Sequence, residues 1–484
     1  MIFQSTVYPN VIPVNGILQQ YLVSGGAISA GDFVQFADAV ATGTKTLIGI
    51  APSTDVPPIL LNETDVLVFG GDGNRTARVV RFTADGISVG EAADLIADGV
   101  SNATVTVHSA EKLTPSQIVI GISRIQTKST ASISYGVYAE IALVTIAGLA
   151  ITPGQRVQLE RFPYSSTTPE RNGVNNVEII ALTTLTGMVC YSMFHVGEFN
   201  DGTTRTELNV NGFSTDGGYL HAGTAYQFAK ASGLSSGEVY GAKVDESTAL
   251  LATNKTPKAL GLVAIADASS AAVSPVGAAL TYAFTTVTKI IVLSDSKFVL
   301  IGSGTNVYGN GAACGYVNGG NNIQLGTMTF LGVKSPSYKR FNVLTRDTIV
   351  TVAGGIARVF RANDDLTITL GEAVTLSTSA AAISPLKMTE NAVFFYGGAQ
   401  ATARVSNLTL SPETITTPAS ADMLTAALYS ESAGTLRVFG GTTAAKGFAN
   451  SLAASVQPYS NAAYGVASTG GAAGETIDVF LPKT

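Results

Sequence analysis

The hydrophobic and polar positions of this chain follow a short phrase that recurs. The phrase is a branched aliphatic residue, Ser or Thr, any residue, Gly, an acidic or amide residue, and then a segment of alternating apolar side chains. Its copies begin at Ile28, Ile87, Ile151, Leu234 and Ile368. Gly adopts a positive φ at no steric cost, and Ser, Thr and acidic side chains bond nearby backbone N–H groups. Each copy therefore predicts a tight turn followed by a half-buried strand.

A second phrase, an apolar strand with a central Gly, lies downstream of each copy or beside it. Its centres are Gly49, Gly121, Gly187, Gly261 and Gly465, with a further instance at Gly332. A glycine inside an apolar strand usually marks a bulge or a close approach of another backbone segment. Together the two phrases predict one small β-unit that the chain uses several times.

Pairs of glycines give a third sign of repetition. Gly70-Gly71 precedes Thr76–Val79, and Gly397-Gly398 precedes a similar segment, Thr402–Val405, with a weaker instance at Gly354–Val359. Units of roughly 60 to 70 residues are too long for a solenoid repeat. The pattern therefore predicts an all-β fold of several small β-barrel or β-sandwich modules in tandem, with few short helices.

The predicted modules divide the chain at its polar, Gly-rich passages. The expected units are residues 1–24 as an N-terminal arm or edge strand, 25–125 as a pair of β-modules, 126–200 as one β-module, 201–340 as a β-module with Gly/Asn-rich loops, and 341–484 as one or more C-terminal β-modules. Helical patterns are short. Ser420 is a candidate N-cap for a helix that ends near Leu428, and residues 226–231 fit one or two helical turns.

Composition narrows the classes of function. The chain has 484 residues, enough for several domains, and only 13% of them are charged, about half the usual share. A formal net charge of -6 argues against a nucleic-acid-binding surface, which needs a basic stripe. Cys190 and Cys314 cannot form a disulfide framework, and the first residues show no secretory signal. We therefore expect a chain that is made in the cytoplasm.

The mean hydropathy of +0.30 raises the question of a membrane. The longest apolar stretch, Tyr135–Ile151, contains Glu140 and is shorter than the roughly 20 residues that a spanning helix needs. Its Val, Ile, Thr and Tyr content favours a buried strand, so no membrane contact is expected. Apolar surface on a protein of low charge is typically covered by other subunits, so we expect a homo-oligomer.

Patterns that resemble catalytic motifs have simpler explanations. The three histidines are isolated in sequence and complete no metal-ligand spacing. Gly233–Gly237 matches the pattern around a nucleophilic serine, but its Ser235 is the turn residue of the recurring phrase. Gly309–Gly315 has one residue too many for a dinucleotide-binding loop. Asp201, Asp216 and Asp364-Asp365 stand in turn-like settings. A pair of glycosidase carboxylates among such acids stays open, because spacing in sequence does not fix spacing in space.

The residues that we single out are therefore structural, and we predict no catalytic, cofactor-binding or metal-binding residues. The acid that follows the turn Gly is expected to cap turn N–H groups or to keep a strand edge soluble. The turn residues that define the recurring unit are Gly31, Asp32, Gly90, Glu91, Gly154, Gly237, Glu238, Gly371, Glu372, Gly474 and Glu475.

The C-terminal segment carries a resemblance. Ala463–Ala467, followed by Ala473–Leu481, resembles the C-terminal signature of the small capsid decoration (cement) proteins of tailed bacteriophages. In that family a Gly-Val-Ala strand, a turn of small residues and an Ala-Gly-Glu-Thr strand close a β-barrel. The resemblance covers about a third of the chain, which differs from the family in its length and in its Gly/Asn-rich loops.

The resemblance implies a virion structural protein. It would be a multi-module capsid decoration or head-fibre protein, made in the host cytoplasm, that packs as a homo-oligomer, with a trimer favoured, against the major capsid protein or other virion proteins. Two alternatives stay open. One is a tail, baseplate or fibre component with host-recognition loops at 198–222 and 302–322. The other is a carbohydrate-active β-protein.

Overall fold

The protein is represented by a computed structural model that describes most of the chain. The described residues are 16–23, 27–30, 32–41, 44–96, 103–126, 136–163, 173–196, 204–216, 218–232, 237–254, 258–294, 296–304, 310–319, 321–332, 340–377, 382–430, 435–458 and 465–482. Nearly all regular structure within them is β-strand. The helical segments described are single 3₁₀ turns, η1 (Asp72–Asn74), η3 (Ser420–Asp422) and η4 (Ala444–Lys446). No helix in these ranges is long and apolar enough to cross a membrane.

The strands form eight sheets, which follow one another along the chain. We call them blades 1 to 8. Blade 1 contains β4 (Ile59–Leu60), β5 (Asp65–Gly70), β6 (Thr76–Thr83), β7 (Gly86–Val89) and β8 (Ala93–Asp94). Blade 2 contains β9 (Ala103–Thr114), β10 (Gln117–Gln126), β11 (Gly136–Ala147) and β12 (Ala150–Pro163). Blade 3 contains β13 (Gly173–Ala181), β14 (Thr186–Val196), β15 (Thr204–Asp216), β16 (Tyr219–Ala222) and β17 (Tyr226–Ser232).

The next three blades repeat this order. Blade 4 contains β18 (Val239–Lys243), β19 (Thr248–Thr253), β20 (Leu260–Asp267) and β21 (Ala272–Leu280). Blade 5 contains β22 (Phe284–Val292), β23 (Lys297–Gly304), β24 (Asn310–Val317), β25 (Ile323–Leu325) and β26 (Thr329–Phe330). Blade 6 contains β27 (Phe341–Val343), β28 (Thr348–Ala353), β29 (Ile356–Ala362) and β30 (Ile368–Thr375).

The last two blades bring the chain back to its beginning. Blade 7 contains β31 (Ile383–Thr389), β32 (Ala392–Gly397), β33 (Ala401–Ser406) and β34 (Thr409–Pro412). Blade 8 contains β35 (Leu424–Ser430), β36 (Thr435–Gly440) and β37 (Phe448–Pro458), and its fourth strand is β3 (Thr46–Leu47), which pairs antiparallel with β37. A strand from the start of the chain thus completes the last blade.

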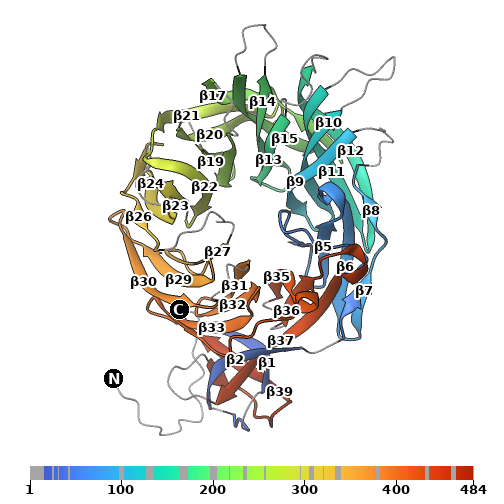
Figure 1. Ribbon diagram of the computed structural model, residues 1–484, viewed down its shortest axis with the longest axis vertical. Coiled ribbons are helices and arrows are strands. Elements are labelled where there is room, and N and C mark those ends of the chain that lie inside the picture. The colour runs from blue at the N-terminus through green and yellow to red at the C-terminus, as the bar shows by residue number, and fades with distance from the viewer. Residues whose placement is uncertain are drawn as a thin grey trace.

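The eight blades are arranged in a ring, with the first strand of each blade nearest the centre (Figure 1). Successive strands within a blade are antiparallel neighbours, and the later ones lie towards the rim. This architecture is a single eight-bladed β-propeller. The prediction of an all-β chain with few helices is confirmed. The predicted tandem of small barrels or sandwiches is wrong, because each four-stranded unit buries its faces only against the units before and after it.

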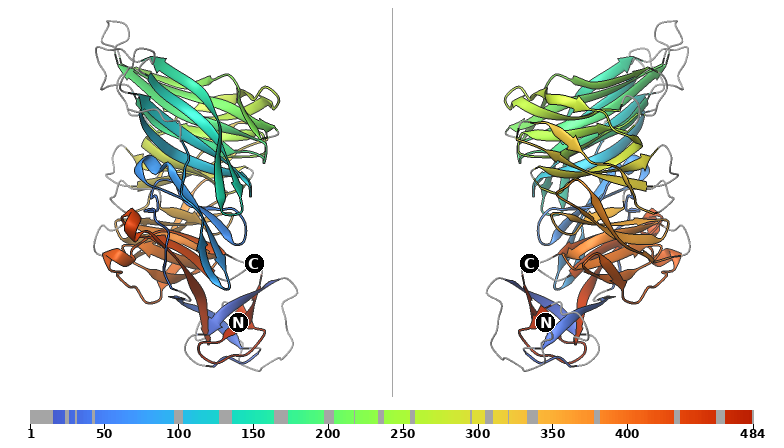
Figure 2. Two further views of the ribbon diagram at one scale, coloured as in Figure 1. Left: turned by 90° about the vertical axis from the view of Figure 1, so that its right-hand side faces the viewer. Right: turned by 90° about the vertical axis from the view of Figure 1, so that its left-hand side faces the viewer.

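A second, smaller closed sheet joins the two ends of the chain. It contains β1 (Gly16–Val23), β39 (Thr476–Pro482), β38 (Gly465–Ala467), β2 (Phe33–Ala41) and the far half of β37, and β1 pairs back to β37. Figure 2 shows that this sheet projects beyond the rim at one end of the ring. The segments with the predicted decoration-protein signature thus lie at the junction of the termini and not in a repeated module.

Each interface between neighbouring blades has its own hydrophobic core. Eight clusters of buried side chains fill the eight interfaces, and the one between blades 8 and 1 contains Ile48, Val66, Val80 and Phe439. The second strand of a blade contributes to two of these cores. In β5, Val66 and Val68 face blade 8, whereas Leu67 and Phe69 face blade 2. This two-sided burial explains why the second strands are apolar at nearly every position.

Two glycines of the sequence phrase, Gly90 and Gly371, mark contacts between blades, and Gly277 and Gly326 outside the phrase do the same. At each, a Cβ atom would lie 2.0–2.6 Å from a carbonyl oxygen in the turn between the third and fourth strands of the next blade. Gly371 in β30, for example, faces the carbonyl oxygen of Leu408 at 2.0 Å. Leu408 itself has a φ of 67°, which turns its carbonyl towards the preceding blade. Gly154 of the phrase instead packs against Leu143 of its own blade, so only some copies of the phrase dock neighbouring blades.

The Gly-strand phrase has a different role at two of its copies. Gly49 and Gly332 have φ values of 68° and 82°, and each packs against the guanidinium group of an Ala-Arg-Val segment, Arg78 and Arg358 respectively. A side chain at either glycine would meet that guanidinium at 3.1–3.2 Å. The two repeated motifs noted in the sequence are thus partners in space.

Both helix predictions are wrong. Only Ser420–Asp422 is helical, as a 3₁₀ turn, and Leu424–Ser430 is strand β35. Residues 226–231 lie in strand β17. Both segments are strands at the edge of a blade, where hydrogen bonds to the neighbouring strand outweigh local helix propensity. The expected boundary at residue 125 falls inside strand β10 and so divides blade 2. The expected boundary at residue 340 directly precedes the first strand of blade 6.

Replacing Gly371 by Ala should destabilise the propeller by about 1–3 kcal/mol, because the new methyl group would overlap the Leu408 carbonyl. Chemical denaturation monitored by fluorescence measures this loss. Gly319→Ala is the matched control, since a Cβ there has nothing within 4 Å. Equal stabilities for the two variants would contradict a tight contact at Gly371.

Candidate functional site

The turns of the propeller divide into two faces. Strands alternate in direction and every blade starts at the centre, so the turns after the first and third strands lie on one face, here called the turn face. Its charged residues are almost all acidic. Within the described turns, the only basic residue is Arg346, and the acids are Glu63, Asp85, Asp245, Glu246, Asp347, Asp364, Asp365 and Glu390.

The turns after the first strands of blades 1, 3, 4, 5 and 6 share one local structure. A backbone N–H at the end of the first strand donates to the carbonyl four residues later, as in Val244 to Thr248 (2.9 Å) and Leu344 to Thr348 (2.9 Å). A short polar side chain just after the donor then bonds the turn from within. Asp245 Oδ1 accepts from the N–H and hydroxyl groups of Ser247, at 2.8 and 3.0 Å. These turns therefore need Asp, Asn, Ser or Thr.

These bonds keep the turn carboxylates ionised. Burial alone would raise the pKa of Asp245, but the bonds from Ser247 and Thr248 outweigh it and lower the pKa. Thr367 donates to Asp365 and lowers the pKa of that carboxyl group. Burial would likewise raise the pKa of Asp347. Hydrogen bonds from Thr345 and Thr348 and the charge of Arg361 outweigh burial, so the pKa is lowered. The turn face therefore stays negatively charged well below neutral pH.

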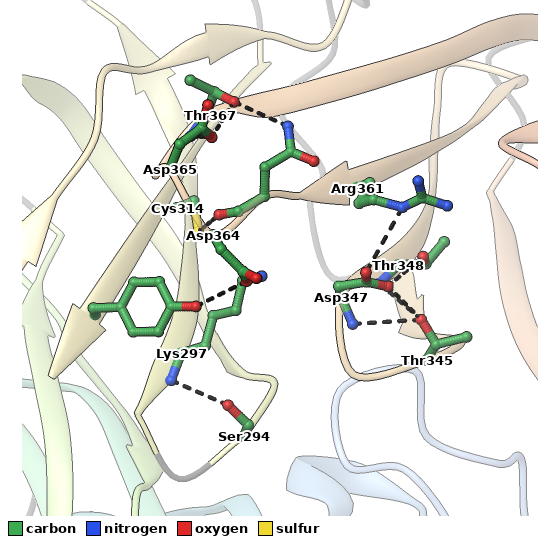
Figure 3. A network of polar contacts seen from close by, with 12 residues as sticks. Ser294, Lys297, Cys314, Thr345, Asp347, Thr348, Arg361, Asp364, Asp365 and Thr367 are labelled. Carbon is green, nitrogen blue, oxygen red and sulfur yellow. Dashed lines mark hydrogen bonds and ion pairs between the residues drawn. The ribbon is translucent and has the colours of Figure 1, made fainter. Parts of the chain in front are cut away.

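An ion pair ties the turn face of blade 5 to that of blade 6 (Figure 3). Lys297 Nζ lies 2.8 Å from Asp364 Oδ1, and the hydroxyl group of Tyr316 donates to the same oxygen at 3.0 Å. The Lys297 side chain is only 7% exposed, whereas that of Asp364 is 91% exposed. Hydrogen bonds from Lys297 and Tyr316 lower the pKa of Asp364. The exposed acid thus compensates a buried cation of the neighbouring blade.

The innermost strands carry a separate charged group. Glu178 on β13 accepts the N–H of Gly241 on β18 at 3.0 Å and pairs with Lys289 on β22 at 3.3 Å. This ion pair joins blades 3 and 5 across blade 4, so it lies on the inner side of the ring. Glu111 on β9 interacts electrostatically with both charges. Desolvation by the surrounding inner strands raises the pKa of Glu111 to about 7, although its side chain keeps contact with solvent.

Lysines at the ends of inner strands hold neighbouring blades together. Lys112 Nζ donates to the carbonyl of Leu60 in blade 1 at 2.7 Å. In the same way Lys243 donates to Leu182, and Lys387 to Leu344. These bonds leave the positive charges of the lysines in place, close to the acids of the turn face.

The turn residues singled out from the sequence do not form one site. Asp32 and Glu475 accept turn N–H groups, from Ser29 and Ala472 at 2.8 Å, in the closed sheet of the termini. Glu238 accepts from Tyr240 and lies before β18 beside Gly237, whose carbonyl accepts from Asn175 at 2.8 Å. The others are spread over the outer strands and the terminal turn, Gly90 and Glu91 after β7, Gly154 in β12, Gly371 and Glu372 in β30, and Gly474 before β39. Gly31 lies outside the described residues.

The residues considered for catalysis do not converge either. His108 and His221 lie on β9 and β16, and His195 on β14. His108 Nε2 is 2.7 Å from Ser123 Oγ, but Ser123 is buried, so this pair bridges strands and cannot reach a substrate. The described residues contain no group of acids, histidines and cysteines that could hold a metal. Asp201 and Ser235 lie outside them.

The sequence reasoning missed the turn face. The acids were recognised as turn residues, but their common side of the ring depends on the order of strands in eight blades. A signal was present in segments such as Leu61–Asp65, Val244–Thr248 and Leu344–Thr348, where an apolar residue, two or three polar residues and Asp or Thr precede an apolar strand. Aligning these segments would have placed Glu63, Asp245, Glu246 and Asp347 on one side.

The inner carboxyl group makes stability depend on pH. Because the pKa of Glu111 is raised from 4.5 to about 7, its stabilising contribution is full below pH 4.5 and is lost as the pH rises through 7. Glu111→Gln, which stays neutral, should unfold about 1–2 °C higher than the wild type at pH 8 and equally at pH 4.5. Thermal scans at the two pH values test this, with the exposed Glu246→Gln as control. A difference independent of pH would contradict it.

Replacing Asp364 should reduce the stability of the protein more than replacing its partner Lys297. Asp364→Asn leaves a buried cation without its anion, whereas Lys297→Met leaves an exposed carboxylate that water solvates. We expect the melting temperature to fall further in the first variant than in the second, and the double variant to recover part of the loss. Asp365→Asn, which removes only a bond within its own turn, is the control. An equal loss at Asp364 and Asp365 would show that the ion pair contributes nothing.

Comparison with known proteins agrees with the fold and goes no further. No family model and no curated protein matches the chain. Among solved structures, Sqt1 from Chaetomium thermophilum is 12% identical with a TM-score of 0.48, over 88% of this chain and 100% of that one. The Dos1 propeller is 9% identical with a TM-score of 0.42, over 78% and 89%. The periplasmic gluconolactonase PpgL of Pseudomonas aeruginosa is 12% identical with a TM-score of 0.37, over 75% and 100%.

With identities and TM-scores this low, these likenesses indicate nothing about function, and the propeller assignment depends on the sheet order. The resemblance to phage capsid decoration proteins is wrong. So are the virion, head-fibre, tail and carbohydrate-active functions that accompanied it. The chain is one closed ring of eight blades, not a set of small barrels, and nothing in the comparisons points to phage proteins. The sheet order of the chain itself is what shows an eight-bladed β-propeller.

Proposed function

We propose that the chain is a non-catalytic β-propeller that binds a positively charged protein partner through its turn face. The observation that carries this proposal is the charge asymmetry of the turns, where Arg346 is the only base that the structure describes, beside acids from blades 1, 4, 6 and 7. Lowered pKa values keep several of these carboxylates charged. A face of one sign attracts partners of the opposite sign over distances near the Debye length, about 10 Å at 0.1 M salt.

Apolar side chains on the same face support protein binding. Leu185 and Tyr219 in blade 3 are 57% and 66% exposed. Their turns are joined by the bond from the Thr215 N–H to the Leu185 carbonyl at 2.8 Å. Large exposed apolar residues beside a charged rim are typical of interfaces between proteins. The same charge would repel nucleic acid and anionic membranes.

Titratable groups with displaced pKa values occur on the inner wall, where Glu111 and Tyr240 both interact electrostatically with Glu178, and also at Tyr191 within blade 3 and at Asp364 in a turn. Self-association, expected from the low charge of the chain, stays a separate prediction that light scattering measures.

Binding of a short oligolysine peptide tests the turn face directly. In low salt the wild-type protein should bind it, and Glu63→Lys with Glu246→Lys should weaken binding by about tenfold. The matched control places two lysines elsewhere, Asp72→Lys and Glu91→Lys, both exposed and outside the turn face.

Equal losses in the two double variants would show that net charge, and not this face, governs binding. Hydrolysis of gluconolactone by the purified protein would contradict the non-catalytic role, because a structural neighbour is named for that activity.

A further inference from the structure

The seam that closes the ring contains a buried arginine that hydrogen-bonds no carboxylate among the described residues. Arg437 lies on β36 of blade 8 and is 3% exposed. Its Cζ atom is 5.3 Å from the centre of the Phe82 ring of blade 1, which packs edge-on against Phe439 at 5.9 Å. The guanidinium group therefore caps the hydrophobic core between the last blade and the first.

Most of the donors of Arg437 are unused. Its Nε and Nη1 atoms have no hydrogen-bond partner in the part of the chain that the structure describes. Nη2 has only a long contact, 3.5 Å, with the hydroxyl oxygen of Ser430. Burial lowers the pKa of Arg437, against the charges of Asp65 and Glu63. A buried cation with unpaired N–H groups is unfavourable unless something compensates it.

Other arginines in the blades show what is missing. Arg81 holds Asp65 at two points, 2.7 and 2.8 Å, and Arg404 holds Glu413 at 2.8 Å. Arg124 likewise holds Glu140 at 2.6 Å. Because Arg81 occupies both oxygens of Asp65, the acid nearest to the seam is not available to Arg437. Water could satisfy the N–H groups but would not neutralise the charge.

We propose that Arg437 is the binding site for a small inorganic anion of chloride size at the seam between blades 8 and 1. The anion accepts from Nε of Arg437 and, through the neighbouring edge of the guanidinium group, lies near the Ser430 hydroxyl. It supplies the negative charge that a carboxylate supplies at Arg81, Arg124 and Arg404. Arg437 and Ser430 belong to blade 8, and Phe82 of blade 1 covers the guanidinium group, so occupancy stabilises the contact between the two blades.

Thermal unfolding of the full chain tests this site. The wild type should unfold at a higher temperature in sodium chloride than in sodium gluconate of equal ionic strength, by about 2–4 °C. Arg437→Met should lose this difference, whereas Arg404→Met, whose arginine already has a carboxylate, should keep it. An equal chloride response in wild type and Arg437→Met would overturn the proposal.

Bromide gives a direct readout that needs no variant. Crystals of the wild-type protein soaked in sodium bromide should show an anomalous peak within hydrogen-bond distance of Arg437 Nε. A peak there together with the chloride response establishes the site. Absence of the peak, with ordered water at the guanidinium group instead, would overturn the proposal even if Arg437→Met failed to fold.

Discussion

The closure of the ring is the constraint on which the rest of the structure depends. Each blade exposes two apolar faces, and eight interface cores bury them only if the last blade meets the first. The two strand residues Thr46–Leu47 complete blade 8 by pairing with β37, so the closure joins residues about 400 positions apart in the chain. The closed sheet of β1, β2, β38 and β39 extends β37 beyond the rim and ties both ends of the chain to the same strand.

Contacts between blades also explain the glycine-rich character of the chain. Where the outer strand of one blade receives a carbonyl of the next, no Cβ fits, as at Gly371 against Leu408. Residues with positive φ, such as Leu408 and Asn321, turn their carbonyls into these positions. Tight packing between blades thus requires glycine on one side and a strained turn on the other. The strain of the turn destabilises the fold locally, and the apolar surface buried between the blades offsets it.

The same geometry distributes the charges. Inner-strand lysines bond carbonyls of the preceding blade, while acids gather in the turns of one face. Charges that lie between blades are mostly paired, as Lys297 is with Asp364. Glu111 on the inner wall and Arg437 at the seam are two groups whose environment opposes their charge. On the turn face, hydrogen bonds to Asp245 and Asp347 outweigh the burial that opposes their charges and lower the pKa of each carboxyl group.

The sequence by itself determined the local structure: strands, turns, scarce helices and a repeated unit with Gly at fixed points. The echoes of Gly70-Gly71 with Thr76–Val79 and of Gly397-Gly398 with Thr402–Val405 are corresponding segments of blades 1 and 7. The sequence could not determine whether such units close individually as barrels or jointly as a ring. Continuous apolar runs such as Val66–Phe69 show that both faces of a strand are buried but not against what. The turn face, the pair Lys297–Asp364 and the seam at Arg437 each combine residues of different blades or of distant turns. Only the tertiary structure shows that these residues lie together, because distance along the chain does not fix distance in space.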